Sequence, residues 1–205
     1  YTITLNITYY KSQLYQFLNI DMRVHFIGNG KSKTLFKSPY GYRIGCNIPK
    51  DDLVYDVLSV IDIKVLLHQQ KEQNYFKPNQ LVWCTQQIKD MSIQKKIPGK
   101  FEALYKSVYR YNSGHHAIEH ISKNKNIKFI ELWGMDSMWH MKGEHDLTSE
   151  MDDRVLRPSR PPLQKQWVPH WKTILSRYPN IKYTIHAPKG VETIDYGANT
   201  DYKLY

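Results

Sequence analysis

Short apolar runs alternate along most of the chain with stretches in which apolar residues recur at helical spacing. The short runs predict strands at residues 24–27, 43–46, 60–62, 81–84, 108–111, 129–133 and 182–186. The helical spacing predicts helices at residues 34–37, 63–70, 101–105, 114–123 and 163–177. Strands that alternate with helices in this way form a parallel sheet. We therefore expect an α/β fold, a single Rossmann-like domain with a mostly parallel sheet flanked by helices.

Residues 137–162 break this alternation, because they are rich in charged residues, Met, Trp and His. A connection of this length predicts a lid-like insertion, here over the carboxyl edge of the sheet. The expected organisation is a doubtful N-terminal extension at 1–21, a Rossmann-like nucleotide-binding domain at 22–190 with its lid at 137–162, and a tail at 191–205. Met22 directly precedes the first strand, so translation is expected to begin there. The alternative is an additional strand and a short helix within residues 1–21.

Composition narrows the class of protein. The chain has 205 residues, of which 41% are hydrophobic and 23% charged, as in a soluble globular domain. No apolar run approaches the ~20 residues of a membrane span. Cys46 and Cys84 both fall in expected strands, which predicts buried, reduced thiols and a cytoplasmic location.

The net charge of +10 predicts an anionic partner. Nucleic acid is not favoured, because the basic residues are spread along the chain and no common nucleic-acid motif is present.

The first strand leads directly into Gly28-Asn29-Gly30-Lys31-Ser32. Glycines at this position of an open α/β sheet let the backbone approach an anionic group, and the amides that start the next helix face that group. Spacing excludes two familiar motifs. A P-loop would need glycine where His25 stands, and the dinucleotide fingerprint would need glycine at Lys33. The loop therefore predicts a nucleotide or phosphate site that belongs to neither motif.

Polar residues also follow the other expected strands or begin a helix: Asn47, Asp62, Asp136, and Ser113 with Gly114. The carboxyl ends of parallel strands lie at one edge of a sheet, so we expect these residues to converge on the same ligand. Ser113 is the expected N-cap of the helix at 114–123. Asparagine amides both donate and accept hydrogen bonds without adding charge. The alternative for Asn29 and Asn47 is that each closes a turn.

Histidines supply the candidate bases, because the unperturbed imidazole pKa of ~6.5 suits proton abstraction near neutral pH. The candidates are His140 and His145 in the expected lid and His170 in the helix that follows it. A solvated loop histidine is the alternative for the two lid residues. His116 and His120 lie one helical turn apart, but no further ligand accompanies them, and no metal site is expected.

Arginines recur every three residues in the expected lid, and two of them, Arg157 and Arg160, are candidates for contacting an anionic substrate. A guanidinium group matches phosphate or carboxylate oxygens with two parallel hydrogen bonds. The alternative is that these arginines form salt bridges with acidic residues of the same segment.

The order of these motifs carries a resemblance to known families. The segment 24–32, the strand that ends at Asn47, the Ser113-Gly114 helix start and the strand followed by Asp136 appear in the order found in small bacterial sialyltransferases that use a CMP-sugar donor. The order is equally similar to that of 6-hydroxymethylpterin diphosphokinase-like proteins and of uncharacterised bacteriophage proteins. The resemblance covers residues 23–136, with weaker support from 183–188.

The resemblance implies that Asn29 and Asn47 contact the donor's phosphate and sugar, and that Ser113 and Gly114 help to seat the nucleotide. Sialyltransferases also use two lid tyrosines on the leaving phosphate and a lid histidine as base. Residues 137–162 contain no tyrosine, so the nucleotide-binding half transfers better than the catalytic half.

The leading expectation is glycosyl transfer from a nucleotide-activated sugar, with no cofactor required. In that reaction a histidine deprotonates the acceptor while backbone amides and basic side chains stabilise the departing phosphate. One alternative is Mg²⁺-dependent diphosphate transfer to a pterin-like alcohol, with Asp62 and Asp136 as candidate metal ligands. Another is a non-catalytic, phage-encoded binding or assembly protein in the cytoplasm of a bacterial host.

Overall fold

The computed structural model describes residues 22–47, 52–72, 76–108, 110–140 and 164–205. Eight strands form one sheet in the order β10-β8-β6-β1-β2-β3-β4-β5, and every neighbouring pair is parallel. The strands are β1 (Met22–Ile27), β2 (Tyr42–Cys46), β3 (Val57–Val60), β4 (Leu81–Thr85), β5 (Lys100–Tyr105), β6 (Ile127–Trp133), β8 (Lys182–Ala187) and β10 (Thr200–Leu204). The expectation of an α/β, Rossmann-like arrangement is confirmed.

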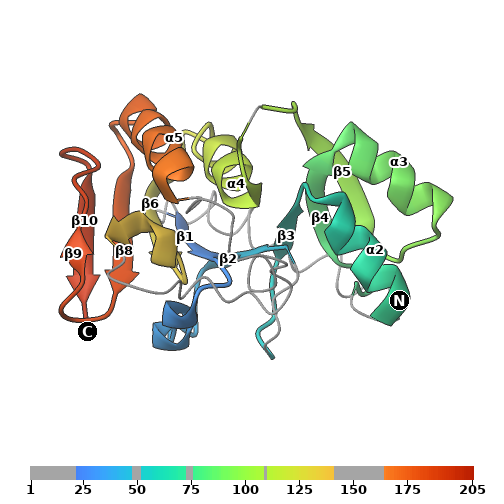
Figure 1. Cartoon of the computed structure of the whole chain (residues 1–205), viewed down its shortest axis with the longest axis horizontal. Coiled ribbons are helices and arrows are strands. Elements are labelled where there is room, and N and C mark those ends of the chain that lie inside the picture. The colour runs from blue at the N-terminus through green and yellow to red at the C-terminus, as the bar shows by residue number, and fades with distance from the viewer. Residues whose placement is uncertain (1–21, 48–51, 73–75, 109, 141–163) are drawn as a thin grey trace.

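Helices cover both faces of the sheet. They are α2 (Ile63–Glu72), α3 (Gln86–Gln94), α4 (Ser113–Ile121) and α5 (Gln164–Arg177), with two 3₁₀ turns, η1 (Lys31–Leu35) and η2 (Asp136–Met138). Figure 1 shows α4 and α5 along one side of the sheet and η1 on the other. Helices α2 and α3 pack on the same face as η1, against β3 and β4. A second, two-stranded antiparallel sheet joins β7 (Trp139–His140) to β9 (Glu192–Thr193).

The strand order reverses beside β1. From β1 the chain proceeds outward through β2, β3 and β4 to β5, and it then returns through α4 to β6 on the other side of β1. Ligands of open α/β sheets bind outside the carboxyl ends of the strands at such a switch point. The fold therefore brings the loops that follow β1 and β6 to the position where a ligand is expected.

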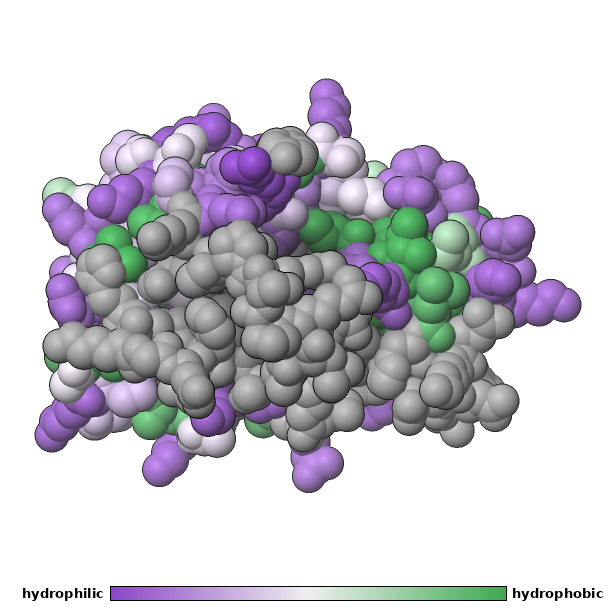
Figure 2. Space-filling view, in the orientation of Figure 1, coloured by the Kyte–Doolittle hydropathy of each residue, from purple (hydrophilic) through white to green (hydrophobic). Residues whose placement is uncertain are grey.

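Exposed apolar side chains gather over one half of the sheet. Figure 2 shows a hydrophobic patch over the β3–β5 half of the sheet and hydrophilic residues around the outline of the molecule. Leu104 and Val108, at and after the end of β5, are each 41% exposed. No helix in the described ranges is long and apolar enough to cross a membrane.

Several expected elements are wrong or shifted. Residues 101–105 belong to the edge strand β5 rather than to a helix, and the described residues of 108–111, which are 108, 110 and 111, lie outside any strand. Helix α3 was not expected, although Thr85 caps it by accepting a hydrogen bond from the Ile88 amide at 3.4 Å. The third strand ends at Val60, and the first helical turn begins at Lys31, three residues earlier than predicted.

The expected tail and lid also need correction. Residues 191–205 supply β9 and β10, so the end of the chain forms an edge of the main sheet. Lys182 and Asp201 form an ion pair at 2.9 Å between β8 and β10. The start of the expected lid is core, because Met138 is fully buried and Trp139 nearly so. Residues 141–162, the rest of the expected lid, lie outside the described residues.

Candidate functional site

The loops after β1 and β6 are joined by backbone hydrogen bonds. The Gly28 amide donates to the Trp133 carbonyl at 2.8 Å, and the Gly30 amide donates to the Gly134 carbonyl at 2.9 Å. A Cβ atom at Gly28 would lie 2.5 Å from the Gly134 oxygen, and Gly134 itself has φ +61°. These glycines are therefore required by the close approach of two backbones at the switch point, before any ligand is considered.

Asp136 directs its carboxylate at the start of η1. Both carboxylate oxygens lie 3.3 Å from the Ser32 amide nitrogen, and the Ser32 hydroxyl donates to Oδ1. A Cβ at Gly30 would lie 2.4 Å from the Asp136 carboxyl carbon, so only glycine leaves room for this carboxylate. Both Ser32 and Asp136 are buried. The Ser32 donors, which the sequence assigned to a phosphate, are thus engaged by a carboxylate of the chain itself.

Asn29 has one satisfied and one unsatisfied side-chain atom. Its Nδ2 donates to the Cys46 carbonyl at 2.9 Å, which fixes the orientation of the amide because a carbonyl can only accept. Its Oδ1 is buried and has no hydrogen-bond partner among the described residues. A buried acceptor without a donor costs about 1–3 kcal/mol. The site therefore favours a ligand that presents an N–H or O–H group to this oxygen.

Asn47 and Ser113 form a polar connection across the next strands. Asn47 adopts φ +55°, a left-handed conformation that asparagine tolerates better than most residues. Its Oδ1 also accepts a hydrogen bond from the Ser113 hydroxyl at 2.7 Å. The Ser59 hydroxyl donates to the Ser113 carbonyl at 2.7 Å. The ends of β2 and β3 and the start of α4 are therefore held together at one edge of the sheet.

The N-cap of α4 is Asn112 and not Ser113, which corrects the sequence prediction. The Asn112 side-chain oxygen accepts from the His115 amide at 2.9 Å, and His115 Nδ1 accepts from the Asn112 amide at 3.0 Å. This reciprocal pair is a capping box with histidine in place of the usual Glu or Gln. Burial lowers the pKa of His115 to about 3, so the ring stays neutral and can accept this hydrogen bond.

The remaining binding candidates lie at the same edge with different surroundings. Gly114 is buried, and a Cβ there would lie 3.3 Å from both Phe26 and Trp171. Lys31, the first residue of η1, is exposed. Asp62 is exposed, and its Oδ1 accepts from the Lys64 amide at 2.8 Å at the start of α2. The structure thus joins Asn29 to β2 and Ser32 to Asp136, whereas the described contacts of Asp62 are local.

Of the candidate bases, the described part of the chain shows the side chain of His170 alone. Its ring meets Tyr111 edge to face at 5.0 Å and His115 at 5.6 Å, near the start of α4. The side chain of His140, and all of His145, Arg157 and Arg160, lie outside the described residues.

The rings of His116 and His120 pack against aromatic side chains of the hydrophobic core. The His116 ring stacks on Tyr105 at 5.0 Å, and His120 meets Trp83 edge to face at 4.8 Å. Burial lowers the pKa of both histidines, that of His116 to about 4. The part of the chain that the structure describes holds no group of three His, Cys, Asp or Glu side chains placed to bind a metal ion.

Both cysteines are free and lie in strands, as expected, with Cys84 buried and Cys46 partly so. Burial raises the pKa of each thiol to about 12, so both remain protonated at neutral pH.

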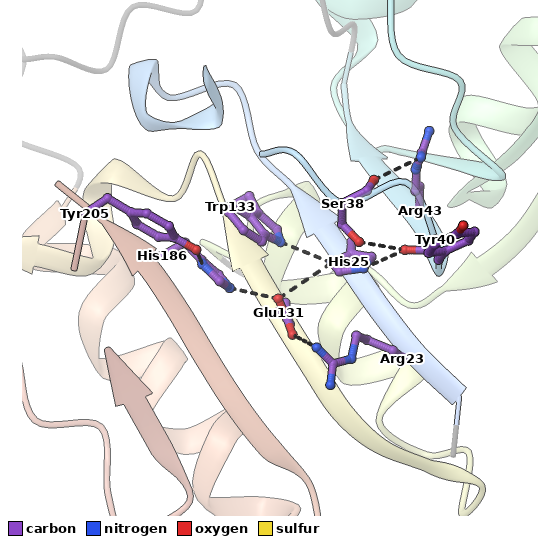
Figure 3. Close-up of polar contacts among 9 residues, drawn as sticks. All are labelled: Arg23, His25, Ser38, Tyr40, Arg43, Glu131, Trp133, His186 and Tyr205. Atoms are coloured by element: carbon purple, nitrogen blue, oxygen red, sulfur yellow. Dashed lines mark hydrogen bonds and ion pairs between the residues drawn. The ribbon is translucent and has the colours of Figure 1, made fainter. Parts of the chain in front are cut away.

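A polar network that the sequence did not predict lies on the face of the sheet that carries η1 (Figure 3). Glu131 in β6 accepts hydrogen bonds from His186 in β8 at 2.9 Å and from Arg23 in β1 at 2.6 Å. The hydrogen bond from His186 lowers the pKa of the Glu131 carboxyl, which keeps it ionised. One carboxylate therefore connects three neighbouring strands.

His25 belongs to this network as a fully satisfied neutral ring. The Trp133 indole N–H donates to its Nδ1 at 3.2 Å, so the proton of the neutral ring is on Nε2, which donates to the Tyr40 carbonyl at 2.9 Å. Burial lowers the pKa of His25, in agreement with this neutral form. His25 therefore has a structural role.

A sequence signal for the network exists. His25, Glu131 and His186 interrupt the apolar residues of their strands, whereas strands of parallel sheets are usually apolar throughout because both faces are covered. A polar residue in such a strand needs a hydrogen-bond partner. Here Glu131 pairs with His186, and His25 pairs with the Trp133 indole and the Tyr40 carbonyl.

No family model matches this chain, and no curated protein or solved structure shows significant similarity to it. Functional inference therefore depends on the fold and on the geometry of the side chains.

Proposed function

We propose that the chain binds a nucleotide or nucleotide-sugar at the carboxyl edge of the sheet, between β1, β6 and the start of α4, and that it transfers the sugar to an acceptor hydroxyl. The buried Oδ1 of Asn29 at the switch point carries this proposal. A ribose hydroxyl or the amino group of a base can donate to this oxygen, whereas an ionised phosphate cannot.

The anionic part of the ligand would be attracted by charge. The chain has a net charge of +10, and Lys31 is exposed next to the loop that holds Asn29. Because Asp136 engages the Ser32 amide and hydroxyl, the phosphate would not occupy the position that it takes in a P-loop. Basic side chains near this edge would stabilise the charge that develops on the departing phosphate. His170 is the candidate base with a described side chain.

A thermal-shift panel tests binding. The ligands are CMP, CDP, UDP, GDP, ATP and a pterin, each with and without Mg²⁺. A ligand at 100 times its dissociation constant stabilises the folded chain by about 2.7 kcal/mol, which raises Tm by several degrees. A shift with a nucleotide that is independent of Mg²⁺ is the expected result. A shift with ATP or the pterin that requires Mg²⁺ would replace the proposal by diphosphate transfer, and no shift would favour a non-catalytic protein.

The variant Asn29→Ala tests the position of the site. It removes the proposed acceptor, so the affinity for the nucleotide found in the panel should fall by about 1–3 kcal/mol, or roughly 5- to 150-fold. Asn126→Ala is the matched control, because Asn126 is exposed and precedes β6 at the opposite end of that strand. Isothermal titration calorimetry gives both affinities. An unchanged affinity in folded Asn29→Ala would contradict the assignment.

A further inference from the structure

Three residues form a hydrogen-bonded chain on the face of the sheet that carries η1. Tyr205 Oη lies 2.7 Å from His186 Nδ1, and His186 Nε2 lies 2.9 Å from Glu131 Oε2. Figure 3 shows the His186 ring between the other two side chains. A hydroxyl, an imidazole and a carboxylate in this order are the components of a catalytic triad, here with a phenol as the outer group.

The direction of each hydrogen bond follows from Glu131. The carboxylate is ionised and can only accept, so His186 Nε2 carries the proton that it donates. In the neutral ring Nδ1 is then an acceptor, and the Tyr205 O–H donates to it. The phenol is thus placed to transfer its proton to the imidazole, and the Glu131 carboxylate would stabilise the positive charge of the resulting imidazolium.

The imidazole is held rigidly while the phenol is accessible. His186 is 2% exposed, and its ring stacks on Trp133 with centroids 3.3 Å apart and planes at 11°. Tyr205 is 40% exposed, and its backbone is fixed by the hydrogen bonds Tyr205 N–H to Ala187 O and Lys189 N–H to Tyr205 O. A buried base with a fixed tautomer and an exposed hydroxyl is the arrangement that activates an oxygen.

The relay is close to the proposed nucleotide site. Turn η1, which follows the Gly28–Gly30 loop, contacts the strands β6 and β8 that carry Glu131 and His186. Lys203 places its ammonium group 5.5 Å from the centre of the Tyr205 ring, which adds positive charge beside the phenol. The surroundings suit an alcohol that is neutral or anionic.

We propose that Tyr205 is a catalytic residue that takes the proton of a substrate hydroxyl, with His186 as the proton acceptor behind it and Glu131 as a positioning residue. The substrate O–H gives its proton to Tyr205 Oη as the phenolic proton passes to His186 Nδ1. The substrate oxygen is left as the nucleophile, and the positive charge on His186 is balanced by Glu131. That this alcohol is the acceptor of glycosyl transfer rests on the proposed function, in which Tyr205 would then replace His170 as the base. The relay itself does not rest on the proposed function.

An aryl sulfonyl fluoride tests the relay without any nucleotide. The Tyr205 oxygen attacks the sulfur, fluoride leaves, and the phenolic proton passes to His186. Tyr40 is an internal reference, because its side chain is 81% exposed and it is twice as accessible as Tyr205. Exposure alone would favour Tyr40 about twofold. We expect peptide mass spectrometry to show Tyr205 modified at least tenfold faster than Tyr40, and a rate for Tyr205 no greater than that for Tyr40 would overturn the proposal.

Variants separate activation from exposure. His186→Gln and Glu131→Gln should each slow the modification of Tyr205 at least tenfold without changing the rate at Tyr40. Asp201→Asn is the matched control, since it removes an exposed carboxylate in β10 that pairs with Lys182 and does not contact His186. A rate at Tyr205 that neither relay variant reduces would contradict the relay.

The comparison of Tyr205 with Tyr40 in the unmodified sequence decides the question even where a variant fails to fold. The sulfonyl fluoride reagent needs no nucleotide, so the two proposals fail separately. If no ligand shifts Tm but Tyr205 reacts faster than Tyr40, only the proposed function is overturned. If a nucleotide shifts Tm but Tyr205 reacts no faster than Tyr40, only the relay is overturned.

Discussion

The strands β1, β6 and β8 present two very different faces. The face under α4 and α5 is apolar and fully buried, with Val24, Phe26, Ile130, Leu132, Tyr183 and Ile185. On the opposite face the alternate residues are His25, Glu131 and His186, of which His186 donates a hydrogen bond to Glu131 while His25 accepts one from the Trp133 indole. Apolar packing tolerates exchanges of similar volume, whereas the polar contacts require one register and one tautomer. The difference suggests that one face supplies stability and the other supplies defined chemistry.

The largest expected effect tests the apolar face. Phe26→Ala removes a fully buried ring from β1 and should lower the free energy of unfolding by about 3–5 kcal/mol, through lost burial and the cavity left behind. Urea unfolding followed by circular dichroism measures this change. A loss below about 1 kcal/mol would mean that this face does not dominate stability.

The next prediction concerns the polar face. Glu131→Leu leaves the His186 N–H without its acceptor and should cost about 1–3 kcal/mol of unfolding free energy. The double variant Glu131→Leu/His186→Leu removes both partners and should recover most of that loss, since two apolar groups can replace a buried polar pair at little cost. Urea unfolding of both variants is the measurement. A double variant less stable than the single one would show that the network itself stabilises the fold.

The last prediction is a change of slope with pH, caused by a histidine of α4, the helix that covers the apolar face. Burial lowers the pKa of His115 to about 3, whereas an unfolded histidine titrates near ~6.5. Between these values the unfolded chain binds a proton that the folded chain does not. The free energy of unfolding should therefore decrease as pH falls, with His115 contributing up to about 1.4 kcal/mol per pH unit.

His115→Gln removes this contribution. Glutamine can retain the capping box with Asn112, so α4 should still form. Urea unfolding of the two proteins at a series of pH values between 4 and 6.5 gives the difference in slope. Parallel curves would mean that His115 is already protonated in the folded protein. The other histidines with lowered pKa values, His25, His116 and His120, are common to both proteins.

The sequence predicts an element correctly where the local pattern of apolar residues determines that element. The central strands β1 and β6 are rich in apolar residues and match the sequence prediction, and the Gly28–Gly30 loop converges with Asp136 as expected. Strand β5 was mistaken for a helix, because an edge strand is only partly buried and lacks a clear apolar run. The β9 and β10 strands were missed for the same reason.

The partners of the site residues could not be predicted. Nothing in the order of residues shows that Asp136 rather than a ligand meets Ser32, because the two are 104 positions apart. The relay residues are similarly distant, since Glu131 and His186 are 55 positions apart. Such contacts depend on the strand order and on the register of the sheet, which the local pattern does not contain.

The central position of β1 has a consequence for synthesis. Its β2 partner follows within the next 20 residues or so, but its other edge pairs with β6, which brings Glu131 opposite His25. At about 5–20 residues per second, that second partner leaves the ribosome roughly 5–20 s later. During this interval β1 has an unpaired edge in a half-formed sheet, and such an edge can pair with another chain. The nascent chain is therefore most exposed to aggregation before β6 has emerged.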